Sequence, residues 1–399
     1  MAQDIPCPRT PHADETTRAC EAPTRLGLWQ RALGLTAPSL AFLGLAAAVE
    51  FGLRWTTPHL DGLDVFVSSE EQQHDFTDRD HVRIFEGDPL LFWRLKPNLR
   101  NATWDFTVVS TNAQGLRHDR PLTRKAPGSV RLVCLGDSVT FGYRVPVVFP
   151  DHPESYDASA RPFPVLIEQR LRDANPGREI EVVTLAVPGY TSQQGLAWLR
   201  RDLGKLEPDL LTICFGWNDV NLRPAADDVT MPMDGWSSGC RALVARSQVL
   251  LRATRWLRGW RAPRASLALT ARVSKDDYVR NVLAAQRLAE SHGAATLIIG
   301  PVYRDATTNP PEAERIAAYR EALRLAAQGE GLAYLEIPEL TERAFPSNRM
   351  LFGELIHPDS LGHAVMAERI LQALDREGLL RHLGLRPPAP LAPRMETGA

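Results

Sequence analysis

A serine directly follows an apolar run in the stretch Leu132–Arg144, which reads LVCLGDSVTFGYR. Gly136 and Asp137 end that run and place Ser138 just beyond it. A serine hydroxyl is a weak nucleophile until a base removes its proton, and that base is usually a histidine oriented by a carboxylate. Ser138 is therefore a candidate nucleophile, and its chemistry requires a histidine and a carboxylate from elsewhere in the chain.

A histidine and a carboxylate occur together near the C-terminus, in the stretch GELIHPDSLGH. Glu354 lies three residues before His357, and in a turn this spacing lets both side chains face one way. Pro358 fixes its own φ and stiffens the position after the histidine. Asp359 is a second candidate partner for the imidazole, although it also suits the N-cap of the next helix. His363 lies on that helix, where packing explains it better than catalysis.

The oxyanion of an acyl-transfer reaction also needs hydrogen-bond donors near the serine. Gly189, in AVPGYTSQQG, and Asn218, in CFGWNDV, each follow an apolar run. A glycine N–H can approach a substrate without a Cβ in the way, and the asparagine amide donates from its side chain. The backbone N–H of Ser138 is a third donor. Each residue also has a structural interpretation, because serine suits an N-cap while glycine and asparagine suit turns. Asp137 and Asp219 are interpreted as structural or capping groups.

Strands and helices alternate from Arg131 onward, and this alternation predicts how the candidate residues are positioned. The predicted strands are Arg131–Leu135, Ile180–Leu185, Leu210–Phe215, Thr296–Ile299 and Ala333–Glu336. The predicted helices are Pro164–Ala174, Ser192–Lys205, Lys275–His292, Pro311–Gln328 and Leu361–Arg376. Fully apolar strands separated by helices imply a parallel sheet covered on both faces, which is a three-layer α/β/α domain. Ser138, Gly189 and Asn218 each fall just past a strand, where such sheets place their sites.

The rest of the chain divides into further predicted regions. They are a disordered tail over 1–26, an apolar segment over 33–54, a β-containing lead-in over 55–126, the α/β domain over 127–385 with an insertion over 221–271, and a disordered tail over 386–399. The alternating run TWDFTVVST, Thr103 to Thr111, predicts strands in the lead-in. Trp256 and Trp260 in the insertion suit either a basic amphipathic helix at anionic lipid or, as we favour, a surface insertion whose tryptophans pack on the domain.

The apolar segment over 33–54 determines the predicted location. Leu33–Leu53 carries no charge before Glu50, and its length suits one membrane span. Arg25 and Arg31 precede the segment and acidic residues follow it, which places the following domain outside the cytoplasm. The alternatives are a cleaved export signal and a buried helix of a soluble protein. We therefore expect an exported domain held by an N-terminal transmembrane helix.

Composition and motifs argue against several other functions. The net charge of −2 over 399 residues creates no field that favours nucleic acid. The chain has neither a GxxxxGKS/T nucleotide loop nor an HExxH zinc motif, and its five cysteines show neither zinc-site spacing nor a disulfide framework. Cys134 and Cys214 are predicted to be buried thiols. Arg272 is predicted to lie on the surface. No metal, cofactor or nucleic acid partner is implied.

Four short motifs, in this order, resemble those of the SGNH (GDSL) hydrolase superfamily. They are GDS at 136–138, the glycine of PGYTSQQG at 189, GWND at 216–219 and ELIHP at 354–358. The resemblance covers Val130 to Gln372 and implies a flavodoxin-like fold, esterase, lipase or acyl-transfer activity, and no metal. It also implies a catalytic triad of Ser138, His357 and Glu354, with an oxyanion hole of Ser138, Gly189 and Asn218. The family has aspartate where this chain has Glu354, but glutamate keeps the charge, so we expect activity to be retained.

The N-terminal layout is similar to that of membrane-anchored bacterial members of this superfamily. In those members an apolar span precedes a stretch like WRLKPN, here Trp93 to Asn98, and a GLR turn. The sequence thus predicts a serine esterase of the cell envelope that acts on acylated lipid or carbohydrate. Two alternatives are an O-acyltransferase of envelope polysaccharide and a non-catalytic binding or scaffold protein with the same fold.

Overall fold

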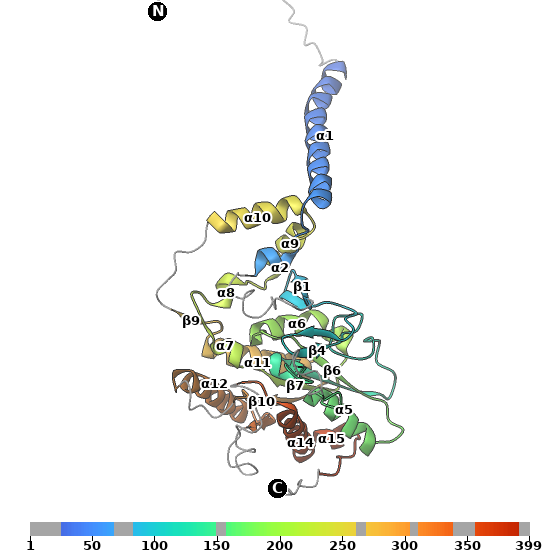
Figure 1. The fold of residues 1–399 in the computed structure, drawn as a ribbon, viewed down its shortest axis with the longest axis vertical. Coiled ribbons are helices and arrows are strands. Elements are labelled where there is room, and N and C mark those ends of the chain that lie inside the picture. The colour runs from blue at the N-terminus through green and yellow to red at the C-terminus, as the bar shows by residue number, and fades with distance from the viewer. Residues whose placement is uncertain are drawn as a thin grey trace, which may run out of the picture. The chain divides into compact units, whose positions relative to one another are not determined.

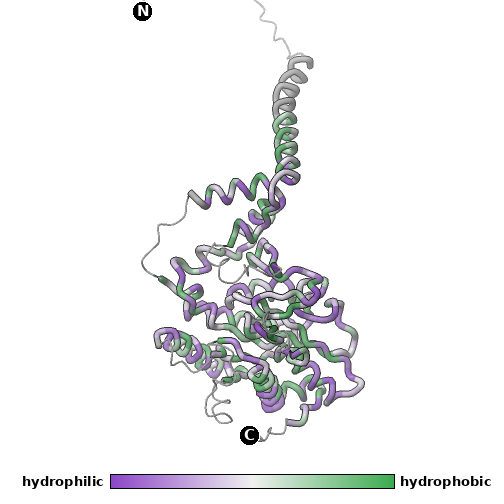
Figure 2. The backbone as a smooth tube through the Cα atoms, viewed as in Figure 1, coloured by the Kyte–Doolittle hydropathy of each residue, from purple (hydrophilic) through white to green (hydrophobic). Residues whose placement is uncertain are grey.

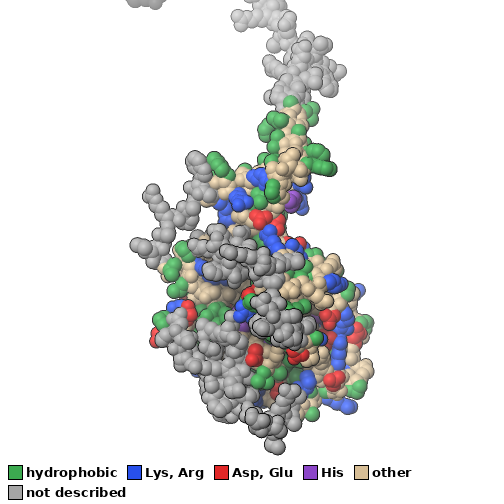
Figure 3. Space-filling model, viewed as in Figure 1, with side chains coloured by type: hydrophobic (Ala, Val, Ile, Leu, Met, Phe, Trp, Pro, Cys, Tyr) green, Lys and Arg blue, Asp and Glu red, His purple; other side chains and the backbone are tan. Residues whose placement is uncertain are grey.

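The computed structural model describes residues 25–67, 83–148, 157–260, 269–303, 310–337 and 356–390. The chain divides into two compact units, over 1–59 and 60–399. Helix α1, Arg25–Thr56, lies in the first unit, and most of its described apolar side chains are exposed (Figure 3). Glu50 and Arg54 form an ion pair of 2.7 Å near its C-terminal end. The predicted transmembrane segment over 33–54 falls on this helix, and within the described part of the chain no helix combines the length and the hydropathy that a membrane span requires.

A five-stranded parallel sheet lies at the centre of the second unit, in the order β11-β10-β7-β5-β6. Its strands are β5 Val130–Gly136, β6 Ile180–Ala186, β7 Leu210–Cys214, β10 Ala295–Ile299 and β11 Tyr334–Leu335. All five predicted strands are therefore confirmed, with ends shifted by at most one residue. From β5 the chain continues to β6 on one side, and then crosses to β7, β10 and β11 on the other side. The strand β5 therefore lies at the topological switch point, where open α/β sheets form their sites.

Helices cover both faces of this sheet and confirm the predicted three layers (Figure 1). One layer contains α5 Phe163–Ala174, α14 Ser360–Arg376 and α15 Leu379–His382, and the other contains α6 Ser192–Leu206, α11 Lys275–Glu290 and α12 Pro310–Gly329. Successive strand residues point to opposite faces, so Leu132 packs in the α5 core and Val133 in the α6 core. Burial on both faces explains why the strands are mostly apolar.

The lead-in forms two small antiparallel hairpins that join the core on the α6 side. Its elements are α2 Gly62–Phe66, β1 Phe85–Asp88, β2 Phe92–Leu95, β3 Ala102–Trp104 and β4 Thr107–Val109. The strands predicted over Thr103 to Thr111 thus correspond to β3, β4 and the turn between them. Trp93 and Trp104 are buried, so the lead-in contributes large side chains to the same core as the sheet.

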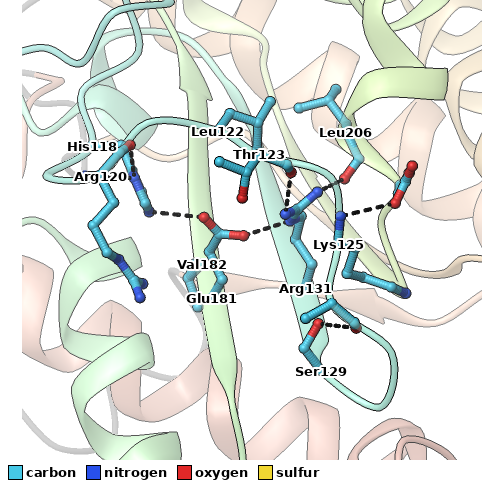
Figure 4. Close-up of polar contacts among 12 residues, drawn as sticks. His118, Arg120, Leu122, Thr123, Lys125, Ser129, Arg131, Glu181, Val182 and Leu206 are labelled. Atoms are coloured by element: carbon cyan, nitrogen blue, oxygen red, sulfur yellow. Dashed lines mark hydrogen bonds and ion pairs between the residues drawn. The ribbon is translucent and has the colours of Figure 1, made fainter.

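Polar contacts hold the connection from the lead-in to β5 at the N-terminal ends of the strands (Figure 4). The buried Arg131 forms an ion pair of 2.5 Å with Glu181 on β6, its register partner. The same guanidinium donates to the carbonyl oxygens of Thr123 and Leu206, each at 2.8 Å. Lys125 adds an ion pair of 2.5 Å with the carboxylate of Asp209. The lead-in is thus tied down at the sheet edge opposite the candidate site.

The short helix α7, Trp217–Val220, leads into the insertion. The elements of the insertion are β8 Leu222–Arg223, α8 Asp227–Thr230, α9 Gly235–Val244, α10 Gln248–Trp260 and β9 Thr270–Ala271. Polar and apolar residues alternate along α10 (Figure 2). The prediction that its tryptophans pack on the domain is wrong for Trp256, which is 58% exposed, and the side chain of Trp260 lies outside the described part.

Candidate active site

Ser138 is the first residue of α4, Ser138–Phe141, and only Asp137 separates it from the end of β5 at Gly136. Gly136 makes this abrupt turn possible. A Cβ at that position would lie 2.1 Å from Oγ1 of Thr140 and 2.7 Å from the carbonyl oxygen of Cys214, so only glycine fits. The hydroxyl is consequently presented at the carboxyl edge of the central strand, with Ser138 8% exposed.

Two buried aspartates next to the predicted site residues have structural roles, as expected. The carboxylate of Asp137 caps α4 by accepting the backbone N–H of Val139 at 3.0 Å. Asp219 accepts the backbone N–H of Ser192 at 3.0 Å and its hydroxyl at 2.5 Å, which joins the end of β7 to the start of α6. Desolvation by burial raises the pKa of both Asp137 and Asp219 to about 7.

His357 lies directly beside the serine, although the two residues are 219 positions apart in the chain. Its Nε2 is 2.8 Å from Oγ of Ser138. The ring of Tyr143 lies against the imidazole, with centroids 4.2 Å apart, and Trp104 meets Tyr143 edge-on at 5.5 Å. Aromatic packing therefore restricts the imidazole to the orientation in which it can accept the serine proton.

The predicted third member, Glu354, lies outside the described residues. Asp359, the second candidate, is the N-cap of α14 and accepts the backbone N–H of Gly362 at 2.8 Å. His363 is fully buried, and its Nδ1 accepts the backbone N–H of Phe163 at 3.2 Å, in agreement with the predicted packing role. Desolvation, together with the positive field of Arg117, lowers the pKa of His363 to about 3.

The two other predicted oxyanion donors reach the same edge of the sheet. Gly189 follows β6 with φ of +82°, a left-handed conformation that glycine adopts without strain. Asn218 follows β7, and its Nδ2 donates to the carbonyl oxygen of Tyr190 at 3.0 Å. This bond uses one of the two amide hydrogens and fixes the plane of the amide.

Arg272 is buried, so the prediction that it lies on the surface is wrong. Its guanidinium pairs with the carboxylate of Asp227 at 2.9 Å and donates to the carbonyl oxygen of Gly189 at 2.8 Å. The buried charge is thereby compensated, and the loop that carries Gly189 is held from behind.

Trp93 in the lead-in holds this same loop from another direction. Its indole Nε1 donates to the carbonyl oxygen of Pro188 at 3.1 Å, and its own carbonyl oxygen accepts the Tyr190 hydroxyl at 2.5 Å. Both side chains are buried, with ring centroids 5.5 Å apart. The WRLKPN stretch marks this residue in the sequence, but nothing local indicates which loop it contacts.

Arg117, in the GLR turn, fixes the segment that follows Ser138. It donates to four backbone carbonyl oxygens, those of Val108, Phe141, Gly142 and Val145, at 3.0, 2.5, 2.8 and 2.6 Å. Its guanidinium also lies 4.5 Å from the centroid of the Phe141 ring. Sequence reasoning did not identify this role. We refer to Trp93, Trp104 and Arg117 together as the lead-in brace.

A cleft of about 750 Å³ contains the predicted residues. It is lined by Trp104, Ser138, Tyr143, Pro188, Gly189, Trp217, Asn218, Asn221, Leu222, Arg223, Leu269, Glu312, Arg315, Ile356 and His357. Clefts of about 880 and 850 Å³ elsewhere contain neither Ser138 nor His357. We refer to Leu222, Arg223 and Leu269, which the insertion contributes, as the insertion wall. The cleft thus combines a hydroxyl, a base within hydrogen-bond distance and amide donors, the groups that acyl transfer requires.

Comparison with known proteins identifies a family that shares this pattern. The model of the GDSL-like lipase/acylhydrolase family matches residues 134–365. No curated protein matches the sequence. Among solved structures, an alpha/beta hydrolase enzyme from the metagenome of Lake Arreo, Spain, is 19% identical with a TM-score of 0.41, covering 63% of this chain and 97% of its own.

Two further solved structures are similar to the same extent. A catalytic mutant of an acetylxylan esterase from Geobacillus stearothermophilus is 18% identical with a TM-score of 0.40, covering 65% of this chain and 96% of its own. A lipase/acylhydrolase from Enterococcus faecalis is 17% identical with a TM-score of 0.40, covering 65% and 98%. With TM-scores this low, none of these three likenesses carries an argument about the chain.

Proposed function

We propose, from the premise that this chain belongs to the GDSL-like lipase/acylhydrolase family, that it hydrolyses esters with Ser138 as the nucleophile and His357 as the general base. The observation that carries this proposal is the distance of 2.8 Å between Oγ of Ser138 and Nε2 of His357. In the first step, Oγ attacks the ester carbonyl carbon while Nε2 accepts the hydroxyl proton. The imidazolium then protonates the departing alcohol, and an acyl-serine remains.

The negative charge on the carbonyl oxygen requires donors that are already in place. The backbone N–H of Ser138 is at the first position of α4, where the helix itself supplies no acceptor. The second amide hydrogen of Asn218 is left over from its bond to the Tyr190 carbonyl. Gly189 supplies the third donor from its backbone. The contacts of Arg272 and Trp93 support this assignment because they hold the Gly189 loop on two sides.

Release of the acyl group repeats the chemistry with water. His357 accepts a proton from water, the hydroxide oxygen attacks the acyl carbon, and Ser138 leaves with the proton that the imidazolium returns. We assign Glu354 to the role of orienting the imidazole and stabilising its charged form, because it precedes His357 by three residues and keeps the charge of the family's aspartate. Asp359 is the poorer choice, since its carboxylate already caps α14.

Labelling and turnover of the full chain test this proposal. We expect a fluorophosphonate to modify the wild-type protein at Ser138, and both labelling and hydrolysis of 4-nitrophenyl acetate to be lost in Ser138→Ala and His357→Ala, by about 10⁴-fold or more in kcat. Glu354→Asp retains turnover, whereas Glu354→Gln loses it. Labelling that persists in Ser138→Ala would exclude Ser138 as the nucleophile, and a wild-type chain that is never labelled would favour a binding protein with this fold.

The location of the enzyme stays a prediction based on the charges that flank residues 33–54. An esterase of the cell envelope would act on acylated lipid or carbohydrate outside the cytoplasm. Fractionation of cells that express the full chain, with ester turnover as the readout, tests this prediction. Activity confined to the cytoplasmic fraction would contradict it.

A further inference from the structure

Two arginines, Arg223 and Arg315, line the candidate active cleft. Arg223 belongs to β8, which pairs with β9 so that Arg223 lies opposite Thr270 and Leu222 opposite Ala271. Arg315 lies on α12 and borders the same cleft as Ser138 and His357. Two positive charges at the mouth of an ester-binding cleft need an explanation, because the acetyl or alkyl part of a neutral ester offers them no counter-charge.

Neither arginine has its donors satisfied. Among the described residues, the buried Nε atoms of Arg223 and Arg315 have no hydrogen-bond partner. The carboxylate of Glu312 is 4.0 Å from the guanidinium of Arg315, which is beyond hydrogen-bond distance, and both side chains are about one-third exposed. Of the described residues that line the cleft, the two arginines carry one positive charge more than Glu312 offsets.

Other arginines near the site use their donors within the protein. Arg272 pairs with Asp227, and Arg117 donates to four carbonyl oxygens. A buried donor without an acceptor costs free energy. Arg223 and Arg315 line the cleft together with Ser138, so a bound substrate can supply acceptors to their unmatched Nε donors.

We propose that Arg223 and Arg315 bind an anionic group of the ester substrate, so that the preferred substrate of this enzyme is an ester that also carries a carboxylate or phosphate. This inference rests on the proposed hydrolase function. A guanidinium presents five N–H donors in a planar fork that matches a carboxylate or phosphate. Leu222 and Leu269, which are 36% and 56% exposed, give the same wall an apolar lip for the uncharged part of the substrate.

Matched ester pairs distinguish on which side of the ester bond the anion lies. For the acyl side, mono-4-nitrophenyl glutarate is compared with its neutral methyl ester. For the alcohol side, 4-acetoxybenzoate is compared with its methyl ester. We expect the ratio of kcat/KM for the anionic over the neutral ester to fall by about 10- to 100-fold in Arg223→Gln and Arg315→Gln, in at least one pair, because bonds to charged groups have this strength.

Three further variants make the test specific. Arg223→Lys restores part of the lost ratio, because it keeps the charge but not the planar fork. Glu312→Gln raises the ratio, because it removes the nearest competing carboxylate. Arg376→Gln, which alters an exposed arginine on α14, keeps the wild-type ratio and controls for the loss of one charge. An unchanged ratio in both ester pairs, in both Arg223→Gln and Arg315→Gln, overturns the proposal.

Binding measured without turnover separates this proposal from the proposed function. In the Ser138→Ala chain, calorimetry gives the Kd of the anionic and the neutral ester of each pair. Tighter binding of the anionic ester that disappears with Arg223→Gln or Arg315→Gln supports the anion site, even in a chain that hydrolyses nothing. Equal Kd values for the anionic and neutral esters in both pairs refute the site, whatever the hydrolysis assay shows.

Discussion

The lead-in brace, whose Trp104 lines the cleft, and the insertion wall use their polar groups differently. The side chains of Trp93 and Arg117 donate to backbone carbonyls, among them that of Pro188 before Gly189 and those of Phe141 and Gly142 after Ser138. Arg223, in the insertion wall, has a buried Nε without a hydrogen-bond partner among the described residues, and Leu269 in the same wall is 56% exposed. The comparison teaches that satisfied donors mark the side of the cleft that positions catalytic groups, whereas unsatisfied donors and exposed apolar groups mark the side that meets substrate.

Arg117→Met should have the largest effect, because it removes the donor for four carbonyl oxygens while keeping an apolar stem. Bonds to charged donors contribute about 1.5–3 kcal/mol each, so we expect the free energy of unfolding to fall by at least about 3 kcal/mol. A displaced Ser138 should lower kcat by about 100-fold. Denaturant unfolding and ester turnover measure the two effects. If fluorophosphonate labels Arg117→Met at the wild-type rate, the brace does not position the serine.

Acid should lower the free energy of unfolding through the buried His363 on α14, behind the site. The pKa of the buried His363 is about 3 in the folded chain and 6.5 when exposed, and Arg117 and His357 both disfavour its charged form. Between these values the folded chain holds fewer protons than the unfolded chain, so stability falls as the pH falls, by up to about 1.4 kcal/mol per pH unit.

The buried carboxyls of Asp137 and Asp219 act with the opposite sign. Their pKa is about 7 in the folded chain against 3.8 when exposed, so they cost stability as the pH rises through this range. His363→Gln keeps both carboxyls, so the difference between the two chains isolates the histidine. Urea unfolding measures the free energy of unfolding of both chains from pH 4.5 to 6.5. As the pH falls, this free energy should decrease less steeply in His363→Gln than in the wild type. Equal slopes in the two chains would contradict a neutral, buried histidine.

Tyr190→Phe should have a moderate effect, because it deletes one buried hydroxyl that donates to the carbonyl oxygen of Trp93. We expect a loss of about 1 kcal/mol in the free energy of unfolding and about tenfold in kcat, because the Gly189 loop loses one of its anchors. Tyr334→Phe also deletes a tyrosine hydrogen bond, to Glu336, but does so on the edge strand β11. The same loss of kcat in both variants would show that stability, and not the position of the loop, determines turnover.

Leu269→Ser in the insertion wall should have the smallest effect. The side chain is 56% exposed, so the free energy of unfolding should change by less than about 0.5 kcal/mol. We expect KM for a long-chain ester to rise by about two- to fivefold, because part of the apolar lip is lost. A loss of stability as large as that of Tyr190→Phe would show that the insertion wall is structural like the brace.

The sheet was predictable because its strands are buried on both faces. Val130–Gly136 and Ile180–Ala186 are nearly continuous apolar runs, and the helices between them show the expected spacing. The pairing of Ser138 with His357 was predictable from motif order, because the ends of parallel strands meet at one edge.

The supporting contacts were not predictable because they join residues far apart in the chain. Arg272 meets Asp227 over 45 positions and Gly189 over 83, and no local pattern marks a buried arginine. The strands β8 and β9 contain two residues each, too few to show any periodicity. The exposure of Trp256 was also not predictable, because an amphipathic pattern does not indicate which surface, if any, the apolar face of the helix contacts.

The position of the lead-in brace indicates which residues must accompany the family region in a fragment that folds by itself. The shared family region starts at residue 134, inside β5, whereas Trp93, Arg117 and the sheet-edge anchor Arg131 all precede it. A truncated gene that encodes only 134–365 would begin midway along the central strand and end inside α14. The folded domain of this protein therefore extends beyond the family region at both ends, and its N-terminal lead-in contacts the segments next to Ser138 and Gly189.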